Sequence, residues 1–260
     1  MLFQMDRLEP NMERGKLNKE YKNIACRIVE EIKSYPGVEG ICLSGSVSRG
    51  FTDRYSDIDL LIYFNHTGYR KLVEKRLDFP IARLGSKYKG IVIDVQWLDL
   101  SEEMKRQWTD IEKWDRSYCL ILFERKKIIR KLFASKLHHL KKKRNLRLFN
   151  LLSEIKHNLE LSQTMIKNKC LVVSQLIMNK ILYDILNSTF ILNNEYTPIE
   201  KWQLHLVYSL PWIPSCFKKD KVFNSLNLKM NIQQSFARYY LLKKSYKECQ
   251  EKTQLLTFME

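Results

Sequence analysis

The chain has 260 residues, 45% of them hydrophobic and 28% charged, and its formal net charge at pH 7 is +16. This composition is typical of a folded globular protein and excludes a disordered chain. The N-terminal residues lack the apolar core of a signal peptide, and no apolar run approaches the roughly 18 residues that a membrane span needs. We therefore expect a cytoplasmic protein.

The positive charge is unevenly distributed along the chain. Residues 1–134 hold 25 Lys and Arg against 20 Asp and Glu, a net charge of +5, whereas residues 135–260 hold 20 against 9, a net charge of +11. A basic surface raises the local concentration of anions such as nucleotides or nucleic acid. The second half therefore leaves nucleic acid open as a partner.

Residues 1–134 alternate between helical and strand patterns. Apolar residues three to four positions apart predict an amphipathic helix over 17–35, which Pro36 and Gly37 end. Short apolar or alternating runs predict strands over 38–45, 56–64, 90–100 and 118–124. Further predicted elements are helices over 67–79 and 101–112 and a strand or short helix over 126–133. This half is therefore expected to be a mixed α/β domain.

Residues 135–260 show helical periodicity and no convincing strand. The predicted helices cover residues 148–168, 170–192, 199–210 and 231–256. We place the domain boundary after residue 134, within a stretch from about 133 to 140 where the pattern changes. The whole chain is thus predicted to be an α+β protein, with a mixed sheet and flanking helices followed by an all-helical bundle.

Two aspartates stand two positions apart at the start of the second predicted strand. Side chains at i and i+2 of a strand point to the same side, so Asp57 and Asp59 project together while Ile58 enters the core. Two like charges held about 6 to 7 Å apart repel each other unless a positive charge lies between them. Carboxylate oxygens are hard ligands that favour Mg²⁺, which keeps positions open for water and substrate phosphates.

A Gly-Ser turn precedes this pair by ten residues. Gly45 allows close backbone approach, Ser46 offers a hydroxyl, and a helix beginning at about 46 would direct backbone N–H groups toward an anion. Arg49 can add a bidentate contact to phosphate oxygens. The pattern from Gly45 to Asp59 therefore predicts a site for a metal-bound nucleoside triphosphate.

A third acid interrupts an apolar strand 35 residues after Asp59. Asp94 is either the outward-facing residue of an edge strand or a third metal ligand, since an acid in such a strand needs a partner. With Asp57 and Asp59 it would complete a site for two Mg²⁺ ions. Such a site stabilises the entering and leaving oxygens at an α-phosphate, which is nucleotidyl transfer with pyrophosphate as the leaving group.

The stretch "GSVSRGFTDRYSDIDLLI" resembles the signature of the DNA polymerase beta nucleotidyltransferase superfamily. The matching positions are Gly45, Ser46, the ten residues 47–56, Asp57, Ile58, Asp59 and, on a later strand, Asp94. The resemblance covers residues 38–96, under a quarter of the chain. It implies a nucleotidyltransferase catalytic domain over 1–134, with an NTP as co-substrate and Asp57, Asp59 and Asp94 as catalytic metal ligands.

The layout of a catalytic domain followed by helices is similar to that of aminoglycoside and lincosamide nucleotidyltransferases. The segment around Pro198 and Trp202 also looks like one that faces the cleft in these relatives. This resemblance implies that residues 135–260 bind the acceptor, that Lys201 contacts phosphate or substrate, and that Tyr196 and Trp202 line the pocket. Trp202 as a core residue beside a solvated Lys201 is the alternative.

We expect transfer of a nucleoside monophosphate, AMP in the first instance, to a hydroxyl of a small molecule, for which an antibiotic is the best precedent. Asp94, Asp99 or Glu124 could serve as the general base. The +11 charge of the second half does not suit a polycationic aminoglycoside. Nucleotide transfer to tRNA, other RNA or protein, as in toxin-like transferases, and a non-catalytic nucleotide-binding module are the alternatives.

Overall fold

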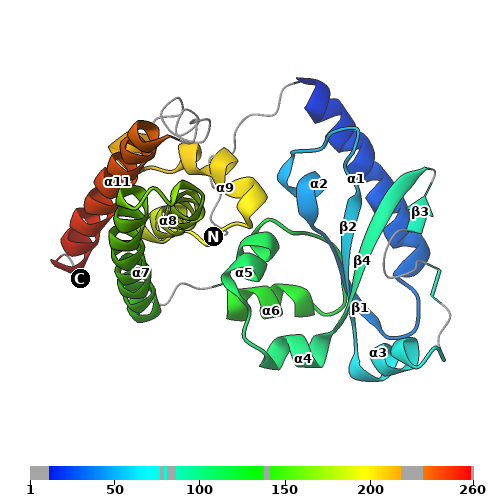
Figure 1. The fold of residues 1–260 in the computed structure, drawn as a ribbon. Coiled ribbons are helices and arrows are strands. Elements are labelled where there is room, and N and C mark those ends of the chain that lie inside the picture. The colour runs from blue at the N-terminus through cyan, green and yellow to red at the C-terminus, as the bar shows by residue number, and fades with distance from the viewer. Residues whose placement is uncertain are drawn as a thin grey trace. The chain divides into compact units, whose positions relative to one another are not determined.

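A computed structural model describes residues 12–76, 79–80, 86–88, 90–137, 141–217 and 231–258. The chain divides into two compact units, Met1–His138 and His139–Glu260. Both appear in Figure 1, and each is described by itself. The boundary predicted after residue 134 lies inside helix α6 (Ile128–Lys136), four residues before the division between the units.

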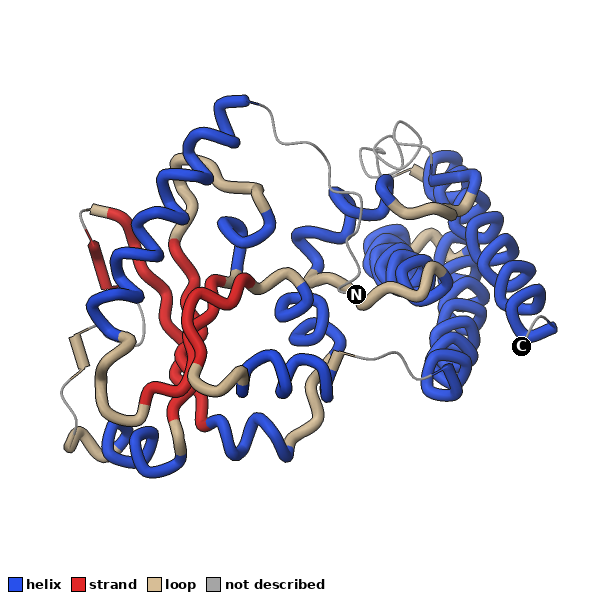
Figure 2. The backbone as a smooth tube through the Cα atoms, turned by 180° about the vertical axis from the view of Figure 1, so that it is seen from behind, coloured by secondary structure: helices blue, strands red, loops and turns tan. Residues whose placement is uncertain are grey.

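The first unit contains a five-stranded mixed sheet with the strand order β3-β4-β2-β1-β5. Its strands are β1 (Val38–Leu43), β2 (Ile58–Phe64), β3 (Ser86–Tyr88), β4 (Ile91–Asp99) and β5 (Leu120–Glu124). Strands β2 and β4 run parallel, and the other neighbouring pairs are antiparallel. Figure 2 shows the strands in red, with helices on both sides. The mixed sheet was predicted, whereas the three-residue β3 was not.

Helices cover both faces of this sheet. They are α1 (Met12–Ile32), α2 (Gly45–Arg49), α3 (His66–Val73), α4 (Leu100–Lys105), α5 (Asp110–Ser117) and α6. Helix α1 lies along one face, and α4, α5 and α6 group on the other (Figure 1). The segment 126–133, left open between strand and helix, is helical from Ile128 onward, where α6 begins.

The single helix predicted over 101–112 is wrong, because two helices occupy this region. Helix α4 ends at Lys105, and a new helix begins at Asp110, with Thr109 as its N-cap. The Thr109 side chain accepts from the Glu112 N–H while the Glu112 carboxylate accepts from the Thr109 N–H, which is a capping box. The local capping bonds therefore end one helix and begin the next.

The alternation of side chains along β2 separates two apolar cores. Ile58, Leu60 and Ile62 pack in the cluster that contains residues of α1. Leu61 and Tyr63 point to the opposite face and pack in the cluster that contains residues of α4 and α6. Asp59 has the same parity as Leu61 and Tyr63, so it belongs to the face of the sheet that α4 and α6 cover.

The second unit contains helices and no strand among its described residues. Its elements are α7 (Lys141–Lys167), α8 (Leu171–Leu192), α9 (Glu200–Leu206), two short 3-10 turns (Val207–Ser209 and Ser215–Phe217) and α11 (Ile232–Phe258). Helices α7, α8 and α11 pack against one another and bury a core that includes Ile155, Ile185 and Leu242. The prediction of a helical second half is confirmed. None of the described helices is long and apolar enough to span a membrane.

Candidate active site

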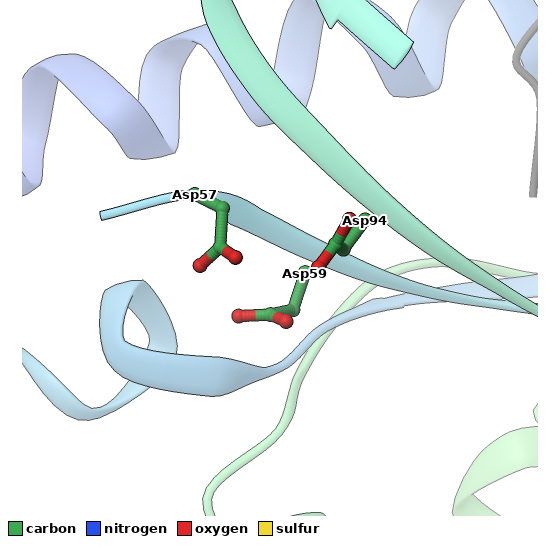
Figure 3. A group of neighbouring side chains, drawn as sticks. All are labelled: Asp57, Asp59 and Asp94. Carbon is green, nitrogen blue, oxygen red and sulfur yellow. The ribbon is translucent and has the colours of Figure 1, made fainter. Parts of the chain in front are cut away.

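Three carboxylates meet at one end of the parallel strand pair. The register of β2 and β4 sets Asp59 beside Asp94, and Asp57 lies two residues before Asp59 with the fully buried Ile58 between them. The three residues offer carboxylate oxygens that all lie within 4.8 Å of one another. Figure 3 shows the side chains projecting into the same space from β2 and the adjacent β4. The structure thus brings together the three acids that the sequence pointed to.

This gathering of acids changes the protonation of Asp59. Burial above all, and then the negative charges of Asp57 and Asp115, raise the pKa of Asp59 to about 7, and the positive charge of Arg49 opposes this rise. The raised pKa indicates that burial and the neighbouring acids outweigh the positive charge of Arg49, so the acids are short of compensating positive charge. Three hard oxygen ligands with this deficit fit a divalent cation such as Mg²⁺.

Gly45 lies directly against one of these acids. Its φ is +64°, and a Cβ atom built on it would lie 1.5 Å from Oδ2 of Asp59. The Ser44 N–H donates to the backbone oxygen of Asp59 over 2.9 Å. Only glycine permits this contact, because any side chain would collide with the carboxylate. The Gly-Ser turn and the acids therefore form one site.

Ser46 is the residue of α2 that is not buried. Gly45, Val47, Ser48 and Arg49 are all buried, whereas Ser46 is partly exposed. Its position next to Gly45 puts it in the part of α2 that lies nearest to Asp59. This placement agrees with a hydroxyl that contacts a ligand at the acids, a contact that stays a prediction.

Arg49 lies in the interior, at a position where a direct phosphate contact was expected. Its Nη1 donates to Oδ1 of Asp115 over 2.7 Å, and its guanidinium lies 4.5 Å from the centre of the Trp114 ring. The side chain is only 5% exposed. In this arrangement the guanidinium is engaged by α5, so a contact from Arg49 to phosphate stays a prediction.

Asp115 is a site residue that the sequence did not reveal. It lies in the last turns of a short helix 66 residues after Arg49, and it also accepts a hydrogen bond of 2.7 Å from the Ser44 hydroxyl. No spacing in the sequence links it to the Asp57 and Asp59 pair. Only the packing of α5 beside α2 brings these residues together.

Asp99 and Glu124 lie at the opposite end of the sheet, so their prediction as general bases is wrong. Asp99 pairs in register with Phe64, five positions along β2 from Asp59, and Glu124 pairs with Gly40. Each is occupied by another partner. Asp99 caps α4 and lies 2.6 Å from Nδ1 of His66, and Glu124 forms a 2.7 Å ion pair with Arg130. Of the three acids predicted as candidates for the general base, only Asp94 lies at the site.

The second unit holds the other predicted contacts. Lys201 is exposed on α9, and Tyr196 and Trp202 are partly buried near the start of that helix. The Trp202 ring lies 5.9 Å from the ring of His205. The contact of Lys201 with phosphate or substrate stays a prediction, as does the role of the two aromatic residues in lining a pocket.

The fold and the site together define a nucleotidyl-transfer class of protein. A mixed sheet carries paired acids on neighbouring parallel strands, and a glycine turn presses against one of them. Residues 25–146 match the family described as the nucleotidyltransferase domain. This part of the chain is therefore a nucleotidyltransferase domain of the polymerase-beta-like type.

Two solved structures are similar to the chain. A nucleotidyltransferase-like protein from Exiguobacterium sibiricum matches with 12% identity and a TM-score of 0.45, over 86% of this chain and 75% of that one. A candidate nucleotidyltransferase from Sulfolobus solfataricus matches with 20% identity and a TM-score of 0.30, over 46% of this chain and 95% of that one. No curated protein matches the sequence.

Proposed function

We propose that the protein is a metal-dependent nucleotidyltransferase of the EC 2.7.7 type. It moves a nucleoside monophosphate, AMP in the first instance, from an NTP to a hydroxyl group of a small molecule, and pyrophosphate leaves. One observation carries the proposal, namely the meeting of Asp57, Asp59 and Asp94 beside the Gly45 turn. This arrangement combines sites for metal and for phosphate within one space.

The three acids are the proposed metal ligands. Asp57 and Asp59 would hold two Mg²⁺ ions, and Asp94 would share in holding the catalytic one. When bound, the ions supply positive charge to the triphosphate and to the oxygens that enter and leave at the α-phosphorus. This demand for positive charge matches the raised pKa of Asp59, which burial and its acidic neighbours cause.

Further roles of the first unit are to bind the NTP donor and to accept the proton of the attacking hydroxyl. Because Gly45 lacks a side chain, the backbone of α2 comes close to the acids, and the partly exposed Ser46 hydroxyl would donate to a phosphate oxygen. Asp94 would also accept the proton of the attacking hydroxyl. Arg49 belongs to the donor site through its position at the end of α2, and Lys201 is a proposed further phosphate contact from the second unit.

A small molecule is the proposed acceptor, with an antibiotic as the class of best precedent. The net charge of +11 over residues 135–260 opposes a polycationic aminoglycoside. An uncharged or anionic acceptor agrees better with this charge. The same charge favours a second candidate function, the transfer of a nucleotide to tRNA or another RNA.

An acceptor screen separates the two functions. Purified protein is incubated with Mg²⁺, each of the four NTPs labelled at the α-phosphate, and either a panel of antibiotics and metabolites or bulk tRNA. The small-molecule proposal predicts label on a small acceptor, together with release of pyrophosphate. Labelled tRNA without any labelled small molecule would contradict it and support the second function.

A salt series provides an independent check on the acceptor. Binding through many phosphates weakens steeply as the salt concentration rises, by about a thousandfold or more between 50 and 200 mM for extensive contacts. At saturating NTP, transfer to an uncharged small molecule should change little over the same range. A steep fall in the rate of transfer at saturating NTP would therefore point to RNA.

A further inference from the structure

Helix α2 is held from outside by a single carboxylate on α5. Asp115 accepts from the Ser44 hydroxyl with Oδ2 and from Arg49 Nη1 with Oδ1, each over 2.7 Å. Ser44 is the residue before α2, and Arg49 is the last residue of α2. One carboxylate therefore bonds to both ends of the five-residue helix that carries Gly45 and Ser46.

The use of the Ser44 hydroxyl is unusual for its position. A serine before a helix commonly caps it, by accepting a hydrogen bond from a backbone N–H in the first turn. Ser44 makes no such bond. Its hydroxyl donates to Asp115 instead, so local helix stability is exchanged for a link to α5. That exchange indicates that the position of α2 matters more than its own cap.

The bonds of Asp115 to Ser44 and Arg49 form a clamp on α2, and burial strengthens this clamp. Arg49 is 5% exposed and Asp115 is 24% exposed, and the Arg49 guanidinium also lies over the Trp114 ring of the same helix α5. An ion pair that is shielded from water is screened less by salt, and losing one partner leaves an uncompensated buried charge. The clamp therefore has two charged bonds and one ring contact, all from neighbouring residues of α5.

The helix that provides the clamp is itself anchored. The capping box of Thr109 and Glu112 fixes the start of α5, and Glu112 forms a 2.6 Å ion pair with Arg106. Burial opposes ionisation, but hydrogen bonds from Arg106 and Thr109 outweigh it and lower the pKa of Glu112 to about 2. Helix α5 is thus fixed before it reaches Asp115.

We propose that Asp115 is a positioning residue for the donor site. It sets the place of the Gly45-Ser46 turn relative to Asp57, Asp59 and Asp94, and Arg49 acts through this clamp rather than by contact with phosphate. The inference rests on the proposed function, because the turn matters only if it receives the triphosphate. Without the clamp, α2 would still have the contact of Gly45 with Asp59, the Ser44 N–H bond and the burial of Val47, but no bond from α5 to Ser44 or Asp115 partner for Arg49.

A double-mutant cycle in the full chain tests this proposal. The variants are Asp115→Asn, Arg49→Gln and the double variant, which restores the net charge near Asp59. Binding of the α,β-methylene analogues of the four NTPs is measured with Mg²⁺, and binding of Mn²⁺ alone reports on the acids. We expect each single variant to weaken nucleotide binding about tenfold and the double variant to be no worse than either single one. Mn²⁺ affinity of the double variant should stay near that of the wild type.

Glu124→Gln is the matched control for a general loss of stability. Glu124 is an acid of the same unit whose side chain is only 9% exposed, and it pairs with Arg130 at 2.7 Å at the end of the sheet opposite Asp59. Its loss should lower the melting temperature without changing nucleotide affinity. Equal nucleotide affinity in Asp115→Asn and Glu124→Gln would overturn the proposal.

Two further results distinguish the remaining explanations. If Arg49 contacts phosphate directly, Arg49→Gln should weaken nucleotide binding more than Asp115→Asn, and the two effects should add, which would also overturn the clamp. If the wild-type protein binds none of the four analogues with Mg²⁺, the proposed function itself is contradicted. A failure of the clamp is therefore seen in the variants, whereas a failure of the proposed function is seen in the wild-type protein.

Discussion

Asp59 is the side chain on which the other parts of the site converge. It faces Asp94 across the strand pair, its carboxylate occupies the space that a side chain at position 45 would need, and its backbone oxygen accepts from Ser44. Burial and neighbouring acids raise its pKa to about 7. The metal-free site is therefore electrostatically strained, and this strain can be measured.

The raised pKa of Asp59 predicts how metal-free stability depends on pH. The pKa is about 7 in the folded protein and about 3.9 in an unfolded chain, so the protonated form favours folding. This contribution is full below about pH 4 and is lost as the pH rises through 7. Asparagine cannot ionise and so avoids this loss, and Asp59→Asn should therefore melt several degrees above the wild type at pH 8 without metal.

Mg²⁺ should reverse the order of the two melting temperatures, because it stabilises the wild type and not Asp59→Asn. Binding requires the ionised carboxylate, so the rise in melting temperature caused by Mg²⁺ should be larger at pH 8 than at pH 6 and absent in Asp59→Asn. Differential scanning calorimetry at the two pH values measures both effects. An equal response of variant and wild type to Mg²⁺ would show that Asp59 is not a ligand.

Gly45 and Gly50 form a matched pair that separates backbone strain from steric collision. Both have positive φ, +64° and +81°, but a Cβ atom on Gly50 would have no neighbour within 4 Å. Gly50→Ala should therefore cost about 1 kcal/mol of unfolding free energy. Gly45→Ala should cost more and should also weaken Mg²⁺ binding, because the new methyl group displaces the Asp59 carboxylate. Urea unfolding and Mg²⁺ titration of the two variants measure the difference, and equal behaviour would rule out the collision.

At the scale of elements, the parallel register of β2 and β4 decides which acids take part in the chemistry. It places Asp94 beside Asp59 and sends Asp99, on the same strand, to the far end beside Phe64. Burial raises the pKa of Asp99, but hydrogen bonds from Ser101 and His66 outweigh this effect and lower the pKa below its ordinary value. Asp99 is thus a helix cap and a hydrogen-bond partner of His66.

Exchanging each of these acids for its amide tests the register. Asp94→Asn should reduce nucleotidyl transfer by about a hundredfold or more, since a metal ligand and proton acceptor is lost. Asp99→Asn should retain transfer and change the unfolding free energy little, since asparagine caps a helix about as well as aspartate. Rate assays and urea unfolding of both variants measure this. Loss of transfer in Asp99→Asn at full stability would contradict the placement.

The anchoring of α5 predicts an effect on the donor site at a distance. Thr109→Ala removes the side-chain half of the capping box and should cost about 1 kcal/mol of unfolding free energy. Because α5 carries Asp115, this variant should also weaken nucleotide binding. Asn65→Ala is its control, since Asn65 caps α3 by accepting from the Gly68 N–H. Isothermal titration with a nucleotide analogue compares the two variants. Equal affinity in both would show that the anchoring of α5 does not affect the donor site.

For the whole molecule, the sequence predicted the parts that depend on local pattern. The strands around Ile58 and Ile93, the acid triad and the helical second half all follow from periodicity or from one short signature. It missed Asp115 and misplaced Asp99, because these depend on packing between elements and on strand register. The sequence also did not reveal that Arg49 is buried and paired with Asp115, since charge alone does not show burial.

The uneven charge belongs to this scale as well. Residues 1–134 carry +5 and residues 135–260 carry +11, so the acids of the site lie in the less basic half of a basic chain. A net positive charge draws NTPs and other anions to the protein and speeds their encounter at low salt. The rate of transfer at low NTP concentration should therefore fall as salt rises, even for an uncharged acceptor, while the rate at saturating NTP stays level.

The position of the label in the donor tests the central claim most directly. The full-length protein is given Mg²⁺, an acceptor mixture of small molecules and tRNA, and each NTP labelled at either the α- or the γ-phosphate. We predict that label from the α-phosphate reaches an acceptor, that label from the γ-phosphate leaves as pyrophosphate, and that Asp57→Asn combined with Asp59→Asn abolishes both. Transfer of the γ-label to an acceptor, or undiminished transfer by the double variant, would contradict metal-dependent nucleotidyl transfer at these acids.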